Sequence, residues 1–183
     1  MRVVAGELRG RRLQAPPGTT TRPTSDRVRE ATFNALESLD AVDGARVLDL
    51  FAGTGALGIE ALSRGADHAT FVERDRAVLR VLRANLAACA LPAERVAVVA
   101  GDGPRSLAQG AIPGPFDLAL LDPPYAFDGW EPLLSTVPAD LVVCETGTAP
   151  ALPEGWAVVR EKSYGATVVT ILRRMGGARR GES

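Results

Sequence analysis

Histidine and cysteine are scarce in this chain of 183 residues, and each shortage argues against a kind of site. His68 is the only histidine, so a transition-metal site built on imidazole is not expected. Cys89 and Cys144 lack the CxxC spacing of zinc and redox sites, and we expect two buried thiols. No apolar run is long enough to span a bilayer, and residues 1–7 lack the apolar core of a signal peptide. The sequence therefore predicts a cytoplasmic protein that binds neither metal nor membrane.

Charge is nearly balanced, with 21 Lys and Arg against 22 Asp and Glu, so the net charge favours no partner. Its distribution is uneven, because Lys162 is the only lysine and arginines gather near the N-terminus. The arginines within residues 1–30 are Arg2, Arg9, Arg11, Arg12, Arg22, Arg27 and Arg29. A guanidinium group pairs with phosphate and stacks on bases, which fits a nucleic-acid partner. A solvated surface explains any one of these arginines equally well.

The sequence pattern changes near residue 46, which separates an N-terminal part from the rest of the chain. Residues 2–14 are expected to form a β-hairpin, and a loop rich in Pro, Gly and Thr leads to a helix that begins near Arg27. From residue 46 onward, apolar runs alternate with amphipathic segments, which predicts buried parallel strands joined by helices. The predicted strands are residues 47–51, 69–73, 96–100, 116–121 and 140–145. Two last strands, residues 156–161 and 167–172, have only a short turn between them and should pair antiparallel.

These elements predict an α/β, Rossmann-like fold, with a mostly parallel seven-stranded sheet that ends in a C-terminal antiparallel hairpin. We expect residues 1–40 to form an N-terminal extension made of the basic β-hairpin and the first helix. Residues 41–174 are expected to form the main domain. Residues 175–183, rich in Arg and Gly, are expected to be a disordered tail.

A glycine-rich turn, Gly53-Thr54-Gly55-Ala56-Leu57-Gly58, follows the first buried strand, and Glu73 ends the next one. This pattern fits a dinucleotide site, in which the glycines approach a pyrophosphate and the acid holds a ribose. It fits S-adenosylmethionine equally well. Asp49 favours the latter, because a carboxylate inside the strand suits a methionine ammonium group and sits poorly beside a pyrophosphate. Asp102 ends the third strand, where it can bond to an adenine amine or cap a helix.

A carboxylate and two prolines follow the fourth predicted strand, in the tetrapeptide Asp122-Pro123-Pro124-Tyr125. Because ligands of open α/β sheets bind near the switch point, this loop should face the glycine-rich turn. An exocyclic base amine is a poor nucleophile, since its lone pair is delocalised into the ring. The Asp122 carboxylate and the Pro123 carbonyl can accept hydrogen bonds from such an amine, and Tyr125 offers a ring for an unstacked base. The tetrapeptide therefore predicts methyl transfer to an amine held in place.

With these motifs, the chain resembles the RsmD-like family of ribosomal small-subunit RNA guanine-N2 methyltransferases over nearly its whole length. The segments that carry the resemblance are residues 2–6, 9–13, 22–30, 33–34, 48–55, 122–125 and 164–165. The glycine-rich turn and the tetrapeptide are shared by many amino-methyltransferases, so they indicate the chemistry. The Arg-Pro-Thr segment that begins at Arg22 is more specific to this family.

The resemblance implies a class I methyltransferase that uses S-adenosylmethionine on the N2 amine of a guanine in 16S ribosomal RNA. The substrate would be the RNA, the small subunit or an assembly intermediate, and we expect a monomer. Contacts to the cofactor are implied for Asp49, Gly53, Gly55, Glu73, Asp102 and Asp122, and contacts to the amine for Asp122, Pro123, Pro124 and Tyr125. Contacts to RNA phosphate are implied for Arg9, Arg11 and Arg12, and contacts to RNA or to the cofactor for Arg22 and Thr24.

Three alternatives stay open at this point. The first is an amino-methyltransferase that acts on DNA adenine or protein glutamine, which use a similar tetrapeptide. The second is an NAD(P)-dependent oxidoreductase, which the glycine-rich turn alone would allow. The third is a binding protein without catalysis, such as an assembly factor.

Overall fold

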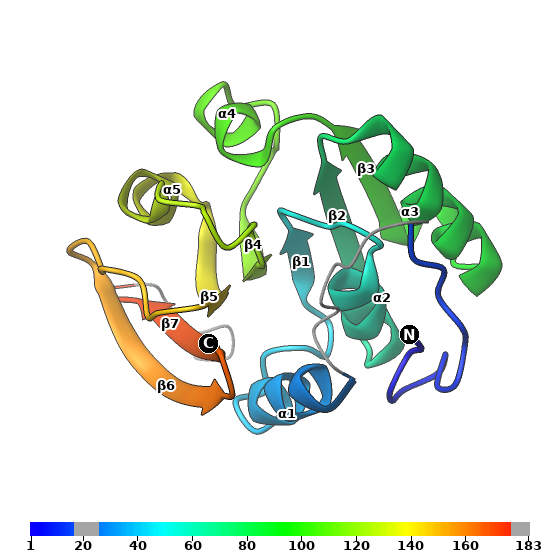
Figure 1. Ribbon diagram of the computed structural model, residues 1–183, viewed down its shortest axis with the longest axis horizontal. Helices are drawn as coiled ribbons and strands as arrows, with labels where there is room; N and C mark the ends of the chain where they lie inside the picture. The colour runs from blue at the N-terminus through cyan, green and yellow to red at the C-terminus, as the bar shows by residue number, and fades with distance from the viewer. Residues whose placement is uncertain (17–25, 177–183) are drawn as a thin grey trace, which may run out of the picture.

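The computed structural model describes residues 1–16 and 26–176. Within these residues, seven strands form one sheet in the order β3-β2-β1-β4-β5-β7-β6 (Figure 1). The strands are β1 Arg46–Asp49, β2 His68–Glu73, β3 Val96–Ala100, β4 Phe116–Leu121, β5 Ala139–Thr146, β6 Trp156–Tyr164 and β7 Thr167–Arg174. The strands β1 to β5 pair parallel, and β7 is antiparallel to both β5 and β6. The predicted mostly parallel sheet with an antiparallel C-terminal hairpin is thus confirmed.

Helices cover both faces of the sheet (Figure 1). They are α1 Asp26–Glu37, α2 Ala56–Ser63, α3 Arg76–Cys89, α4 Gly103–Ala108 and α5 Trp130–Thr136, with a 3-10 turn η1 at Ala93–Arg95. The helices α1, α2 and α3 pack on one face, and α4 and α5 pack on the other. Successive strand residues point to opposite faces, so Leu118 and Leu120 of β4 join the first layer, and Ala119 and Leu121 the second. None of the helices within the described ranges has the length and apolarity needed to cross a bilayer.

The N-terminal segment, residues 1–16, is less regular than the predicted hairpin. Its two halves run antiparallel and are joined by backbone hydrogen bonds such as that from Val3 N–H to the Arg11 carbonyl, at 2.9 Å, so the hairpin itself is present. The segment has one bridge, between Arg2 and Arg12, and no regular strand, so the prediction of two strands is wrong. The cause is a competing acceptor on α2. The backbone N–H groups of Val4 and Ala5 donate to the Glu60 carboxylate, at 2.8 and 3.0 Å, and not to the opposite half of the hairpin.

Glu60 is the centre of a buried charge cluster that fastens the N-terminal segment to the domain. Its side chain is fully buried and pairs with Arg29 of α1, at 3.4 Å, and with Arg64 after α2, at 2.8 Å. Both guanidinium groups are also nearly inaccessible to solvent. Loss of one partner of such a pair leaves a buried charge without compensation, which destabilises a protein by about 3–5 kcal/mol. Residues 1–16 are therefore part of the fold.

A second buried side chain, Asn85 of α3, ties the end of the N-terminal segment to the glycine-rich turn. Its amide oxygen accepts the Gln14 N–H at 2.8 Å, and its amide nitrogen donates to the Gln14 carbonyl at 3.1 Å. The same nitrogen donates to the Thr54 carbonyl at 2.9 Å. One amide group thus holds both segments in a fixed relation.

The two cysteines lie in different layers of the core. Cys89 and Cys144 are both buried and free, which confirms the predicted thiols. Burial raises the pKa of the Cys144 thiol to about 12, so this side chain stays protonated and packs as a small apolar group.

Candidate active site

The glycine-rich turn lies at the carboxyl ends of the parallel strands, between β1 and α2. Gly53 and Gly55 both have positive φ, 55° and 83°, which favours glycine at these positions. A Cβ atom on Gly55 would come within 2.5 Å of the Leu82 side chain, whereas the space above Gly53 is open. Gly55 is therefore required for packing, and Gly53 leaves its backbone accessible to a ligand.

Glu73, at the end of β2, shapes this turn through both of its carboxylate oxygens. One accepts the Gly53 N–H at 3.0 Å, and the other accepts the Asp75 N–H at 2.7 Å. A carboxylate oxygen can accept more than one hydrogen bond, so the same group can also receive the hydroxyl groups of a ribose. Asp75 itself caps α3 by accepting from Ala77 and Val78.

Asp49, at the end of β1, is a buried acid with a strongly altered pKa. Its side chain is 1% exposed and accepts one backbone hydrogen bond, from Gly58 N–H at 2.9 Å. Burial raises its pKa to about 7; the Gly58 hydrogen bond lowers it, and the charges of Asp122 and Glu73 raise it further. The carboxylates of Asp122 and Glu73 therefore both act on Asp49 beside the glycine-rich turn.

This electrostatic environment distinguishes between the two cofactors that the turn alone allows. A pyrophosphate would bring negative charge towards Asp49, Glu73 and Asp122. S-adenosylmethionine carries a sulfonium and an ammonium group, and such cations would compensate the same carboxylates. The residues present thus fit S-adenosylmethionine and fit a dinucleotide poorly.

Asp102 follows β3 and makes two local interactions. One carboxylate oxygen accepts the Arg105 N–H at 3.1 Å and caps α4, and the other lies 3.6 Å from the Arg74 guanidinium. The Gly101 N–H donates to the Glu73 carbonyl at 3.0 Å, which keeps the β3–α4 loop beside the end of β2. Helix capping, one of the two roles considered for Asp102, is thus present in the structure.

The tetrapeptide Asp122–Tyr125 follows β4, the neighbour of β1 in the sheet. Phe127, just beyond it, packs edge-to-face on Phe51, next to the glycine-rich turn, with ring centroids 5.5 Å apart. Phe127 also packs on Trp130, at 5.3 Å. The two loops therefore lie against each other, as the strand order predicts.

Tyr125 is exposed over 65% of its surface, yet its ring orientation is fixed. Its hydroxyl group lies 3.2 Å from the Thr167 hydroxyl group of β7, and its ring packs so close to Gly147 that a Cβ atom there would be 3.2 Å away. A large exposed ring held at its hydroxyl end is available for stacking by a planar ligand.

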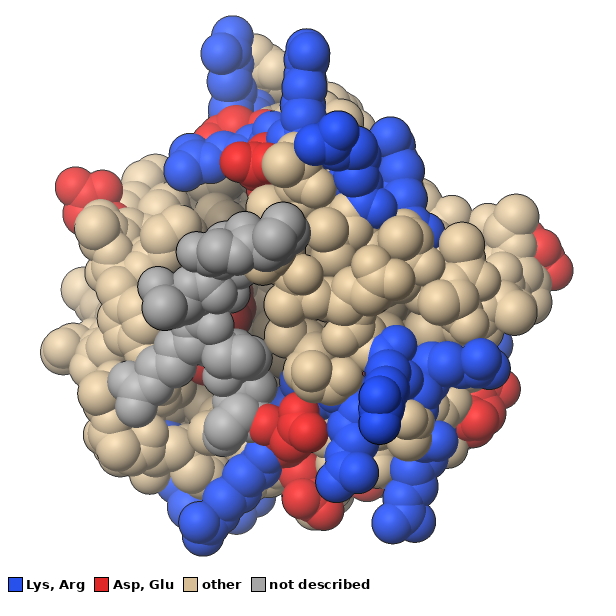
Figure 2. Space-filling model, turned by 45° about the vertical axis from the view of Figure 1, so that its right-hand side comes forward, with Lys and Arg blue, Asp and Glu red and all other residues tan. Residues whose placement is uncertain are grey.

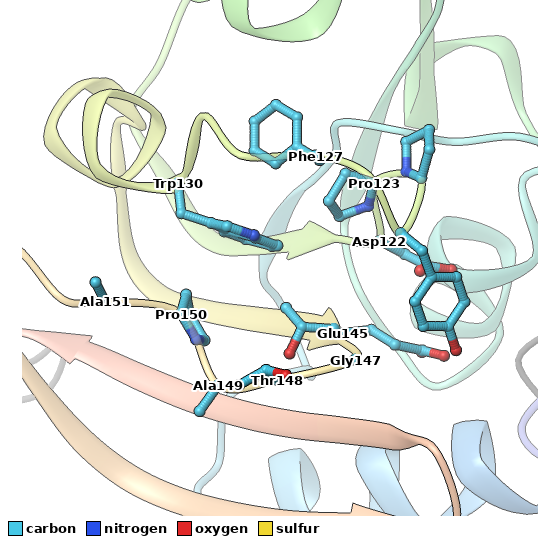
Figure 3. A pocket seen from close by; sticks show the side chains of 13 residues that line it. Asp122, Pro123, Phe127, Trp130, Glu145, Gly147, Thr148, Ala149, Pro150 and Ala151 are labelled. Carbon is cyan, nitrogen blue, oxygen red and sulfur yellow. The ribbon is translucent and has the colours of Figure 1, made fainter.

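A cavity of about 320 Å³ opens beside the tetrapeptide (Figure 3). It is lined by residues 122–125, by Phe127 and Trp130, and by residues 145–151, which form the last two positions of β5 and the segment that follows. Figure 3 shows the side chains of Asp122 and Glu145 leaving the ends of β4 and β5 in the same direction. The sequence reasoning missed Glu145, because it belongs to no motif and only the register of β5 with β4 brings it beside Asp122.

The predicted RNA-binding residues come from the N-terminal part of the chain, and none of those that the structure describes lines the cavity. Arg9, Arg11 and Arg12 are exposed on the N-terminal segment, whereas Arg22 and Thr24 lie outside the described residues. In the view of Figure 2, Lys and Arg side chains gather in two groups, at the top and at the bottom of the face shown. Basic charge is thus concentrated at particular parts of this surface.

The sheet order, the glycine-rich turn after β1 and the tetrapeptide after β4 together define a class I, S-adenosylmethionine-dependent methyltransferase. The chain belongs to the RsmD-like family, because the family model described as Conserved hypothetical protein 95 matches residues 1–173.

Individual relatives agree with this assignment. The chain is 37% identical to the Escherichia coli protein named Ribosomal RNA small subunit methyltransferase D, over 95% of this chain and 90% of that protein. It is 36% identical to the Haemophilus influenzae protein of the same name, over 90% and 89% of the two chains. The solved structure of the Escherichia coli protein yhhF has a TM-score of 0.82 and 38% identity, and covers 95% of this chain and 97% of that one.

We expect Glu73→Ala to weaken binding of S-adenosylhomocysteine by about 10- to 30-fold, because charge-assisted hydrogen bonds are lost. Isothermal titration calorimetry measures the change. Glu94→Ala, which removes an exposed acid from η1, is the matched control. Equal affinities for the Glu73 variant and the wild type would exclude Glu73 from the cofactor site.

Proposed function

We propose that this protein transfers a methyl group from S-adenosylmethionine to the N2 amine of a guanine in small-subunit ribosomal RNA. The observation that carries the proposal is the position of Asp122. Its side chain lines the cavity on one side, and its charge acts on Asp49 beside the glycine-rich turn on the other. Relatives named as methyltransferases of the small-subunit ribosomal RNA support the choice of polymer.

The cofactor side of the site follows from the acids around the turn. S-adenosylmethionine supplies the methyl group as a sulfonium electrophile when it is bound. Asp49 would pair with its ammonium group, Glu73 would accept hydrogen bonds from the ribose, and Asp102 would lie near the adenine. Gly53 and Gly55 allow the backbone to approach the ligand closely.

The substrate side of the site follows from the tetrapeptide. The Asp122 carboxylate and the Pro123 carbonyl would each accept an N–H of the amine, which directs the nitrogen lone pair towards the methyl group. Pro123 and Pro124 restrict the backbone and so fix the direction of that carbonyl. Tyr125 would stack on the base. The C–N bond forms as the C–S bond breaks, and the proton released from the amine passes to Asp122 or to water.

The RNA would be held outside the cavity by arginines of the N-terminal segment. Arg9, Arg11 and Arg12 would contact phosphate groups, and Arg22 and Thr24, which lie outside the described residues, are proposed to contact the RNA as well. Such contacts position the polymer without reading its sequence, whereas the cavity chooses the base.

We expect the double variant Arg11→Gln/Arg12→Gln to bind RNA more weakly and with less dependence on salt. The slope of log K against log salt concentration should become shallower by about 1.5, since roughly 0.7–0.9 counterions are released per phosphate contact. Filter binding over a salt series measures this slope. Arg160→Gln/Lys162→Gln on β6 removes the same charge and serves as the control. Identical slopes for the Arg11/Arg12 variant and the wild type would contradict the assignment.

The function is tested directly with radiolabelled S-adenosylmethionine. The protein is incubated with small ribosomal subunits from cells that lack it, and the labelled nucleoside is identified by mass spectrometry. The expected product is N2-methylguanosine in the ribosomal RNA. Label in DNA, or in protein glutamine, with none in RNA would instead support the other amino-methyltransferases. A thermal shift produced by NAD and not by S-adenosylhomocysteine would support an oxidoreductase.

A further inference from the structure

Glu145 stands in the same structural position on β5 as Asp122 does on β4. The two strands are parallel neighbours, and Leu121 of β4 is in register with Cys144 of β5. An acid follows each of these two residues in the chain, Asp122 after Leu121 and Glu145 after Cys144. Neighbouring strands lie about 4.8 Å apart, so the backbones of the two acids start close to each other at the same edge of the sheet.

Both acids border one cavity. Glu145 and Asp122 line it together, and their side chains point in the same direction from the strand ends (Figure 3). Glu145 is half-buried, so its carboxylate is partly shielded from water. Tyr125, whose ring packs on Gly147 just after β5, borders the same cavity. A base stacked on Tyr125 would thus present its edge to two carboxylates.

The edge that suits two carboxylates is one that carries several hydrogen-bond donors. In guanine, the N2 amine is next to the N1–H group, so adjacent donors lie along one edge. In adenine and cytosine, the atom next to the exocyclic amine on the pairing edge is a ring nitrogen with a lone pair. In glutamine, it is the amide carbonyl oxygen. Among these amines, guanine N2 is therefore the one with a neighbouring donor.

We infer that Glu145 is a specificity-determining residue that selects guanine by accepting a hydrogen bond from its N1–H group while Asp122 holds the N2 amine. The inference rests on the proposed function, since it concerns the base that enters this cavity. A target with an acceptor beside its amine would bring a lone pair against the Glu145 carboxylate. That repulsion disfavours adenine, cytosine and glutamine at the same position.

The test replaces the target guanine of the RNA by 2-aminopurine. This base keeps the N2 amine but has a lone pair at N1 in place of N1–H. Once the methylated nucleotide is mapped, reconstituted small subunits are prepared with guanine or with 2-aminopurine at that nucleotide. The kcat/KM for methylation of each is measured with wild-type protein, with Glu145→Gln and with Glu161→Gln. Glu161 is an exposed acid of β6, so its variant controls for the loss of one negative charge.

Wild-type protein should prefer guanine to 2-aminopurine by roughly 10- to 100-fold, the range for one charge-assisted hydrogen bond to a base edge. Glu145→Gln should lower kcat/KM for guanine by about 10-fold and should reduce the preference to about threefold or less. The amide of glutamine can donate to N1 of 2-aminopurine, so the second substrate should lose little or gain. Glu161→Gln should behave as wild type.

Two results would overturn the inference while leaving the proposed function intact. A Glu145→Gln variant with the wild-type preference for guanine would exclude Glu145 as the selecting residue, even if total activity falls. Equal use of both bases by wild-type protein would show that N1–H is not read. If wild-type protein methylates neither RNA but labels another polymer, the proposed function itself fails, and this inference fails with it.

Discussion

Asp122→Ala should lower the turnover number by at least about 1,000-fold, which corresponds to roughly 4 kcal/mol of transition-state stabilisation. The expected loss is large because Asp122 would act on the nitrogen that is becoming positively charged as the C–N bond forms. The alanine variant removes the acceptor and the local negative charge together. Single-turnover kinetics with labelled S-adenosylmethionine measure the effect on the chemical step.

A matched pair of variants separates the two roles of Asp122. Asp122→Asn keeps an acceptor oxygen but cannot take the proton, so activity within about tenfold of wild type would identify hydrogen bonding as the main role. Binding of S-adenosylhomocysteine to the alanine variant should stay within a few-fold of wild type, as checked by calorimetry. A wild-type turnover number in Asp122→Ala would refute the catalytic assignment of the tetrapeptide.

Asp49→Asn should stabilise the ligand-free protein and weaken its cofactor binding, in a way that depends on pH. The folded-state pKa of Asp49 is about 7, against an ordinary value of 3.8 for an aspartate. As pH rises from 3.8, the unfolded chain releases this proton first, so the free energy of unfolding falls until the folded state ionises near 7. The full difference between the two pKa values corresponds to a decrease of up to about 4 kcal/mol in the free energy of unfolding. Asparagine, which stays neutral, avoids that loss.

Urea unfolding at a series of pH values measures this prediction. Near pH 8 the free energy of unfolding should be greater for Asp49→Asn than for wild type by up to about 4 kcal/mol, and near pH 4 the two should converge. Affinity for S-adenosylmethionine should fall by roughly 10- to 100-fold in the variant. Below about pH 7, the affinity of the wild-type protein for S-adenosylmethionine should decrease as the pH is lowered, because Asp49 becomes neutral, whereas Asp49→Asn should not show this decrease. A wild-type protein whose unfolding free energy is flat between pH 4 and 7 would contradict the raised pKa.

Elements with strong local patterns could be predicted from the sequence. The apolar runs of β3 and β4 match those strands residue by residue. β4 is buried inside the sheet, whereas β3 is a half-buried edge strand that its run of Val and Ala still identifies. The helices α4 and α5 were not predicted. They have only 6 and 7 residues, which is too few to show a helical period, and each contains proline.

Features that depend on distant partners could not be predicted. The N-terminal segment has the composition of a hairpin, but its ladder gives way to Glu60, which is 55 residues away from Ala5. Asn85 has no motif of its own, and its bonds to Gln14 and Thr54 appear only when three segments meet. Within the candidate site, Asp122 was identified because it belongs to a motif. Glu145 was missed because its importance arises from the register of β5 with β4.

Under the proposed function, the buried contacts of Glu60 with the backbone of Val4 and Ala5 would affect how tightly RNA is held. A basic arm that is a loose peptide loses conformational entropy when it docks on a polymer, and its affinity is reduced accordingly. Here the chain that carries Arg9, Arg11 and Arg12 is already ordered when the domain folds. Its guanidinium groups would therefore meet the proposed RNA from a backbone that is already ordered, and less of their electrostatic attraction would be offset by lost entropy.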